Sequence, residues 1–218
     1  MTKTVTGEAT YRERITLPAS FVGVLPCADC PGIRYTLDLF PGNYYFVRLT
    51  YLERADAKPF DQIGRWSLSG DGSTLALTSG RRSTERFAVK GDVLRKLDMR
   101  GREIESKLNY DLRRTGTFER IEPRLAMRGM FQYIADAANF RECQTGQRWP
   151  VAMEGAYKEL EAAYVKARRQ SGQEVLVDIE GLIAMRPKAD GAGETATVVV
   201  ERYTGIRPGE TCGPPAVR

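Results

Sequence analysis

The sequence predicts an all-β-dominated fold in two domains, with a single helix. Through the first half, short runs of alternating, β-branched and aromatic residues are separated by turn signals at intervals of about ten residues. After a polar segment, Gly116–Leu125, the order changes to three strand-like runs, one helical run and two further strand-like runs. These observations predict a β-barrel domain over residues 1–118 and a second domain over residues 119–218.

Composition and charge narrow the class of protein. The chain has 218 residues, 42% of them hydrophobic, which is enough to bury a substantial core. Residues before Pro123 hold 20 Lys and Arg against 16 Asp and Glu, and the remainder hold 13 against 12. Because the second domain is nearly neutral, we expect no nucleic acid among its partners. No run of about 18 apolar residues is present, so no membrane-spanning helix is expected.

The first domain should contain eight or nine antiparallel strands. Residues 33–39 alternate apolar and polar side chains, and the aromatic, β-branched run 44–52 follows after the turn Pro41-Gly42-Asn43. Five later runs begin near residues 64, 74, 85, 93 and 106, and a first run is expected near Ala9–Leu17. This number of strands is enough to close into a small barrel without exposed edges.

The second domain has the element order of an OB-type five-stranded barrel. The runs 125–134 and 138–143 form a predicted hairpin with Asp136 near its turn, and 147–152 is a short third strand. Helical spacing of apolar residues predicts a helix over Glu154–Arg169, with Gly172 as its stop. Two longer strands are expected at the end of the chain, over residues 174–187 and 195–206.

Cys27-Ala28-Asp29-Cys30 allows three chemical interpretations. A redox-active CxxC usually begins a helix, whose N-terminus stabilises the thiolate. Here Pro31-Gly32 leads directly into a strand, and Asp29 adds a negative charge that disfavours a thiolate, so redox catalysis is disfavoured. The two sulfurs could instead hold copper(I), or they could form a small disulfide in a turn.

The other two cysteines, Cys143 and Cys212, are a candidate disulfide in the second domain. An even number of cysteines, divided two and two between the domains, favours an oxidising compartment. The chain-entropy estimate is about 4.4 kcal/mol for a loop of some 70 residues, against about 2 kcal/mol for the CxxC loop. If oxidised, the second pair would therefore contribute more to stability.

The stretch Phe21–Phe40, FVGVLPCADCPGIRYTLDLF, is distinctive as a whole. Its motif-flanking residues are Gly23, Leu25 and Pro26 before the first cysteine, Asp29 between the two, and Gly32 and Ile33 after them. This run resembles the hallmark of the NlpE (copper homeostasis, CutF) family of bacterial outer-membrane lipoproteins. Similar segments span residues 51–78, 91–112 and 127–151, so the resemblance covers nearly the whole chain.

The resemblance implies a lipocalin-like first domain and an OB-like second domain. It also implies a lipoprotein on the periplasmic side of the outer membrane, linked to copper tolerance and to signalling of envelope or surface-contact stress through a sensor kinase of the Cpx type. Neither a signal segment nor a lipobox cysteine is present, so the lipid anchor is inferred from the family. With no histidine in the chain, Cys27 and Cys30 remain as copper(I) ligands, and the resemblance favours a Cys143–Cys212 disulfide.

An enzyme is not expected. The chain lacks histidine, and we expect Asp38, Asp111, Glu159 and Glu161 to occupy ordinary solvated positions. The alternative function is a lipocalin-like carrier of a small apolar ligand. Its cavity would be lined by aromatic side chains of the first domain, namely Tyr35, Tyr44, Phe46, Tyr51 and Trp66, although a barrel of this size more often has a filled interior.

Overall fold

The chain divides into two compact units, Met1–Ile121 and Glu122–Arg218, called here the barrel unit and the OB unit. The computed structural model describes residues 15–53, 58–80, 83–188 and 191–213. Residues 119–121, assigned to the second domain from the sequence, lie in the barrel unit because the Ile121 amide bonds to Asp38 in a barrel strand. No helix among the described residues has the length and apolar character needed to cross a membrane.

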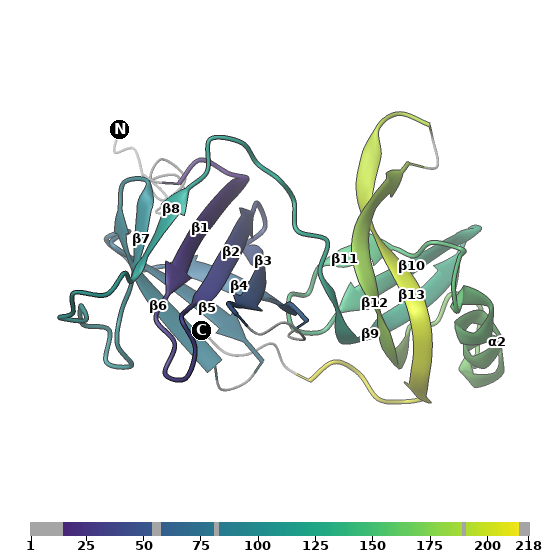
Figure 1. The fold of residues 1–218 in the computed structure, drawn as a ribbon. Coiled ribbons are helices and arrows are strands. Elements are labelled where there is room, and N and C mark those ends of the chain that lie inside the picture. The colour runs from purple at the N-terminus through teal and green to yellow at the C-terminus, as the bar shows by residue number, and fades with distance from the viewer. Residues whose placement is uncertain (1–14, 54–57, 81–82, 189–190, 214–218) are drawn as a thin grey trace, which may run out of the picture. The chain divides into compact units, whose positions relative to one another are not determined.

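The barrel unit is a closed antiparallel barrel whose strands follow one another in chain order (Figure 1). Its strands are β1 Ala19–Leu25, β2 Ile33–Phe40, β3 Tyr44–Tyr51, β4 Phe60–Leu68, β5 Thr74–Ser79, β6 Ser83–Lys90, β7 Val93–Lys96 and β8 Asp111–Arg114. Closure comes from pairing of β1 with β8, at Phe21–Arg114 and Val22–Arg113. The predicted meander and its closure are confirmed, while the strand expected near Ala9–Leu17 falls mainly on residues outside the described ranges.

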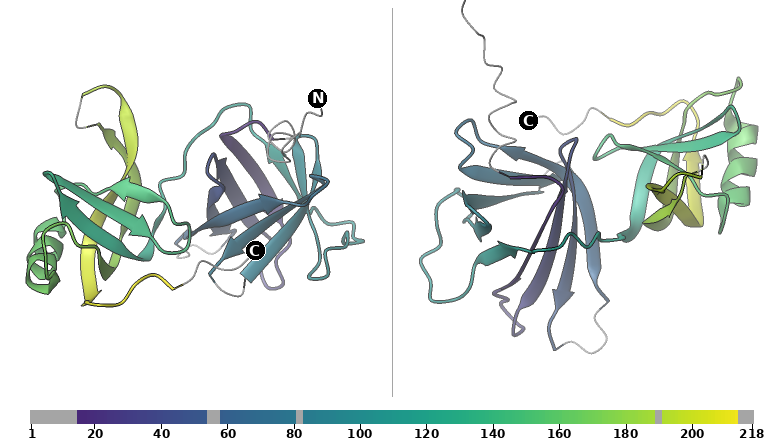
Figure 2. Two further views of the ribbon diagram at one scale, coloured as in Figure 1. Left: turned by 180° about the vertical axis from the view of Figure 1, so that it is seen from behind. Right: turned by 90° about the horizontal axis from the view of Figure 1, so that it is seen from above.

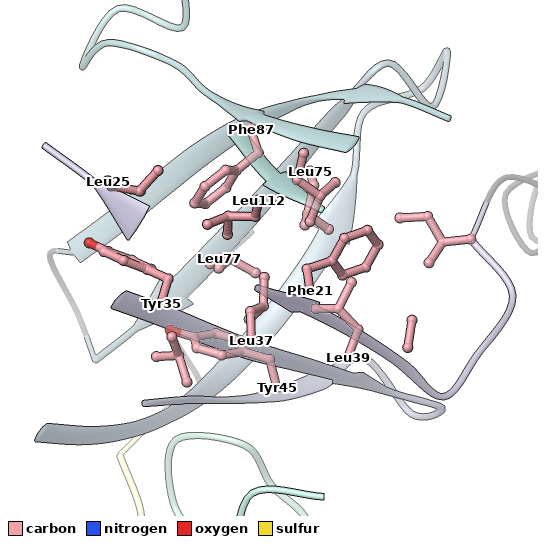
Figure 3. Packing of buried hydrophobic residues seen from close by; sticks show 14 residues of the cluster. Phe21, Leu25, Tyr35, Leu37, Leu39, Tyr45, Leu75, Leu77, Phe87 and Leu112 are labelled. Atoms are coloured by element: carbon pink, nitrogen blue, oxygen red, sulfur yellow. The ribbon is translucent and has the colours of Figure 1, made fainter. Parts of the chain in front are cut away.

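Alternation along the strands fills the barrel. Leu37 and Leu39 of β2 are fully buried in the interior cluster, together with Phe21 of β1 and Phe87 of β6 (Figure 3). Ile15, which precedes β1, belongs to the same cluster. Each such side chain contributes roughly 1.5–3 kcal/mol when fully buried, so the packed interior stabilises the barrel.

The OB unit is a five-stranded sheet in the order β11-β10-β9-β12-β13, with one helix between β11 and β12 (Figures 1 and 2). Its elements are β9 Arg124–Ile134, β10 Ala137–Glu142, β11 Arg148–Pro150, α2 Tyr157–Ala167, β12 Val175–Pro187 and β13 Glu194–Arg207. The two ends of the sheet meet at a parallel bridge between Val151 and Val198, where the Ala152 amide donates to the Val198 oxygen at 2.9 Å. This is the predicted element order.

Helix α2 is shorter than predicted at both ends. Gly155 has φ +61°, a left-handed conformation, and a Cβ there would collide with the main-chain oxygen of Val200, so the helix begins only at Tyr157. Its buried face packs on the sheet, with Tyr164 edge-on to Phe131 at 5.0 Å between ring centroids. The Tyr164 hydroxyl donates to the Gln173 oxygen at 2.8 Å, which fixes the chain after the helix.

Candidate functional site

The CxxC forms the corner between β1 and β2. Cys27 and Cys30 are joined by a disulfide, with Cα atoms 5.3 Å apart. The connection Pro26–Gly32 is a bend, and the strands on either side pair from Leu25–Ile33 onward. Within this described stretch no helix begins at either sulfur, so the corner lacks the helix-end activation that thioredoxin-type sites use.

Two glycines that flank the corner lie where a Cβ atom would collide with a neighbour. At Gly23, a Cβ would collide with the main-chain oxygen of Asp111, because β1 approaches β8 closely there. At Gly32, a Cβ would overlap the side chain of Val24, and the Gly32 oxygen accepts the Leu52 amide at 3.0 Å. These glycines are therefore required by packing, and Pro26 ends β1 because it has no amide hydrogen to extend the ladder.

The corner places three potential ligand atoms together. Asp29 Oδ1 lies 3.3 Å from Cys27 Sγ, and the Gly32 oxygen lies 3.4 Å from Cys30 Sγ. In the disulfide neither sulfur carries a hydrogen, so these are contacts; after reduction each thiol has an acceptor within reach. One ligand atom each from Cys27, Asp29 and Cys30 lies within 4.8 Å of the others. Two thiolates suit copper(I), which the corner could bind only after reduction.

Comparison with known proteins identifies the family. The family model for the NlpE N-terminal domain matches residues 21–107, and that for the NlpE C-terminal OB domain matches residues 121–213. Lipoprotein NlpE of Escherichia coli strain K12 is 34% identical over 197 residues, covering 90% of this chain and 81% of that protein. The chain belongs to the NlpE family. The resemblance inferred from the sequence is thereby confirmed.

Two solved structures of lipoproteins are also similar to the chain. The crystal structure of the Cpx pathway activator NlpE from Escherichia coli matches at 33% identity with a TM-score of 0.39, covering 90% of this chain and 98% of that one. The structure of a putative lipoprotein from Shewanella oneidensis matches at 29% identity with a TM-score of 0.42, covering 53% of this chain and 100% of that one.

Cys143 and Cys212 form a second disulfide, which in this NlpE-family chain holds the segment that follows β13. Their Cα atoms are 5.2 Å apart, and they are 69 residues apart in the sequence. Cys143 directly follows β10, where its amide donates to the Arg128 oxygen of β9 at 2.9 Å. Cys212 lies in the segment after β13, so the bridge fastens this segment to the sheet.

The turn that carries Cys143 is built around the buried carboxylate of Glu142. This side chain is 1% exposed, and it accepts the Gln144 amide at 2.8 Å and both the amide and the hydroxyl of Thr145 at 2.7 Å. Burial raises the pKa of Glu142, although these hydrogen bonds act in the opposite direction. Because the turn has its own hydrogen bonds, we expect it to survive reduction, which would then act on the segment that ends at Cys212.

The cavity that the described residues form in the barrel is too small for a carried ligand. A cavity of about 10 Å³ lies beside Tyr35, Tyr45 and Glu85. That volume suits about one water molecule, whereas ligand pockets usually begin near about 300 Å³. Burial raises the pKa of Tyr45 to about 12. The packed aromatic and aliphatic side chains thus act as core, which weighs against the carrier alternative.

Two of the aromatic residues expected inside the barrel face outward instead. Tyr45 and Val47 of β3 belong to the interior cluster, so Tyr44 and Phe46 alternate to the outer wall. There the Tyr44 ring stacks on Phe40 at 4.7 Å. The prediction that Tyr44 and Phe46 line a cavity is therefore wrong. Their side chains belong instead to a covered surface on the outside of the barrel.

Asp38 was expected to be solvated, and that prediction is also wrong. Its side chain is 0% exposed and accepts the Ser20 hydroxyl at 2.6 Å and the Ile121 amide at 2.7 Å. Burial raises the pKa of Asp38, while the two hydrogen bonds lower it. The sequence held one signal of this: Phe40 and Phe46 are apolar at outward positions, which indicates that the outer wall is covered.

Proposed function

We propose that this chain is a non-enzymatic, periplasm-facing outer-membrane lipoprotein that signals envelope or surface-contact stress to a sensor kinase of the Cpx type and contributes to copper tolerance. Its NlpE family membership supports this, since the Escherichia coli relative is described as a Cpx pathway activator. The observation that carries the proposal is the part-exposed Cys27–Cys30 corner, where two sulfurs and a carboxylate are available without a helix end to activate them. Such a corner suits sensing and recognition rather than catalysis.

The two units have different roles in this proposal. The barrel unit carries the partner surface, because the distinctive cysteine corner lies there. The OB unit tunes signalling through the redox state of Cys143 and Cys212, because their disulfide fastens the segment after β13. Reduction would release Cys212 in that segment while the hydrogen-bonded turn at Glu142 persists.

A reporter strain tests the proposal. The full chain, exported with a lipoprotein signal, would be overproduced in a bacterium that lacks its own family member and carries a Cpx-regulated reporter. We expect reporter output to rise when the full chain is overproduced. The variant Cys143→Ser/Cys212→Ser should give an output that differs from that of the unaltered chain. A matched control is the same chain without the anchor cysteine of the added signal. No response, in cells whose own family member raises the output, would contradict the proposal.

Copper(I) binding at the corner is a second candidate function, favoured by the spacing of the Cys27, Asp29 and Cys30 ligand atoms. The reduced full chain carrying Cys143→Ser/Cys212→Ser would be titrated with copper(I) against a colorimetric chelator. We expect about one equivalent of copper(I) to bind, through two thiolates. Binding should be lost in the further variant Cys27→Ser/Cys30→Ser and kept in Asp29→Asn. Equal binding by the Cys27→Ser/Cys30→Ser variant would exclude the corner as the site.

A further inference from the structure

A buried row of side chains crosses the outer wall of the barrel. Cross-strand pairs join Ser20 of β1 to Asp38 of β2, Asp38 to Phe46 of β3, and Phe46 to Ile63 of β4. These four residues are 4%, 0%, 0% and 2% exposed. Their strand neighbours Phe21, Leu37 and Leu39, Tyr45 and Val47 belong to the interior cluster, so the row points away from it.

Residues 115–121, called here the strap, lie over this row after β8 ends. The Thr115 amide donates to the Ser20 oxygen at 2.9 Å, at one end of the strap. At the other end, the Ile121 amide donates to Asp38 Oδ2 at 2.7 Å, while Asp38 Oδ1 accepts the Ser20 hydroxyl. The Asp38 carboxylate thus joins the strap to the wall through a main-chain amide, a contact that does not depend on the side chain at position 121.

Aromatic rings beside Asp38 hold the side chains of the strap. The Arg120 guanidinium lies over the Phe40 ring at 4.5 Å, and its Nη2 donates to the Tyr44 hydroxyl at 3.4 Å. Phe118 meets Phe40 edge-on at 5.7 Å. A guanidinium above an aromatic face is attracted by the ring quadrupole, so the wall selects a cation at this position.

The row contains a buried carboxylate, which we would not expect if the wall were covered only for stability. Burying a carboxylate is unfavourable unless it is hydrogen-bonded, and an apolar side chain at position 38 would cover the same surface without that penalty. The carboxylate and the rings contact two features of the strap, the Ile121 main-chain amide and the Arg120 guanidinium. Ile121, the aliphatic residue of the strap, is 5% exposed.

We propose that the outer wall of β1–β4 is a peptide-binding site that the chain's own residues 118–121 occupy, and that its ligand in trans is an extended peptide with an arginine followed by an aliphatic residue. A partner with such a segment would displace the strap and take over its contacts with Asp38 and Phe40. The inference is independent of the proposed signalling function, because it concerns the occupancy of one surface.

A labelled peptide with the sequence of residues 115–122, TGTFERIE, tests the proposal with the full chain. The tethered strap competes at an effective concentration of about millimolar, so the peptide should bind Phe118→Ala/Arg120→Ala at least about tenfold more tightly than the unaltered chain. Adding Asp38→Ala should weaken that binding by about tenfold or more, because the charge-assisted acceptor is lost. Fluorescence anisotropy would report binding, with a scrambled peptide as the control.

Equal binding of the peptide by the unaltered chain and by folded Phe118→Ala/Arg120→Ala would overturn the proposal. If that variant does not fold, hydrogen exchange of the unaltered chain decides. Millimolar peptide should speed exchange of the Ile121 amide, because displacement exposes it, and the scrambled peptide should not. Unchanged exchange of that amide would show that residues 118–121 are a fixed part of the barrel.

Discussion

The two disulfides of this chain are placed very differently. Cys27–Cys30 closes a corner between adjacent strands, whereas Cys143–Cys212 joins residues 69 apart and fastens the segment after β13. At the corner, pairing of Leu25 with Ile33 already joins β1 and β2. In the OB unit, the disulfide attaches a segment that β13 no longer holds.

We therefore expect the two disulfides to contribute differently to stability. Closing a short loop removes little chain entropy, so we expect the Cys27–Cys30 disulfide to contribute little to stability. Closing the long loop removes more chain entropy, so we expect reduction of Cys143–Cys212 to lower the stability of the OB unit. Each unit contains one tryptophan, Trp66 in the barrel unit and Trp149 in the OB unit, so the two effects can be measured separately in the full chain.

The largest effect is expected from Cys143→Ser/Cys212→Ser. We predict that the OB unit loses up to about 4 kcal/mol of unfolding free energy, because the open chain regains the entropy of a long loop. Urea unfolding of the full chain with Trp66→Phe would report this through Trp149, which is 5% exposed. The barrel, followed through Trp66 with Trp149→Phe, should keep its midpoint. An equal loss of unfolding free energy in both units would contradict the predicted difference between the two disulfides.

Gly23→Ala should destabilise the barrel by about 1–3 kcal/mol, because its Cβ would force β1 away from the Asp111 oxygen of β8. Gly116→Ala is the matched control, since a Cβ at Gly116 meets nothing within 4 Å. Urea unfolding followed by Trp66 measures both variants. Equal midpoints for the two would show that the β1–β8 approach is not tight.

Cys27→Ser/Cys30→Ser should cost at most about 2 kcal/mol in the barrel, and less where strand pairing already restricts the loop. The urea midpoint measured through Trp66 should therefore move less than the OB-unit midpoint moves without Cys143 and Cys212. A larger shift in the barrel would mean that the corner is a structural staple.

The smallest effect concerns acid stability of the OB unit. Hydrogen bonds from Arg128, and then from Arg207, hold the pKa of Asp178 below its usual range. Since the folded-state pKa is lowered, this contribution is present above the unfolded pKa of about 3.9 and is lost as the pH falls through the folded value.

Asp178→Asn should therefore lower OB-unit stability at neutral pH by about 1 kcal/mol and flatten its decline below about pH 4. Unfolding midpoints across this pH range, read from Trp149, would test this, with the exposed Glu159→Gln as control. An unchanged acid profile would show that the ion pairs around Asp178 contribute nothing.

The fold could be predicted largely because its signals are local. Alternation over residues 33–39 and the glycine-containing turns gave the barrel meander, and the strand after Pro31-Gly32 indicated a corner without a helix. The sequence predicted helix α2 but made it too long, because only the structure shows that Gly155 has a left-handed conformation.

The covered outer wall could not be predicted, because its contacts are not local. Alternation places Asp38 and Phe46 on the face opposite Leu37, but it does not say whether a later segment covers that face. The Ile121 amide that meets Asp38 is 83 residues further along the chain. Burial that depends on so distant a contact is only weakly visible in the local sequence. Here the sign of it is that β3 has apolar residues on both faces.

The central claim is that the corner does not activate its sulfurs, and their alkylation rate tests it most directly. The full chain with Cys143→Ser/Cys212→Ser would be reduced and treated with iodoacetamide at pH 7, folded and in guanidinium. We predict that Cys27 and Cys30 react no faster in the folded chain than in the unfolded one, because Asp29 is near and no helix end is present. Folded-state alkylation faster by about tenfold or more would contradict the account.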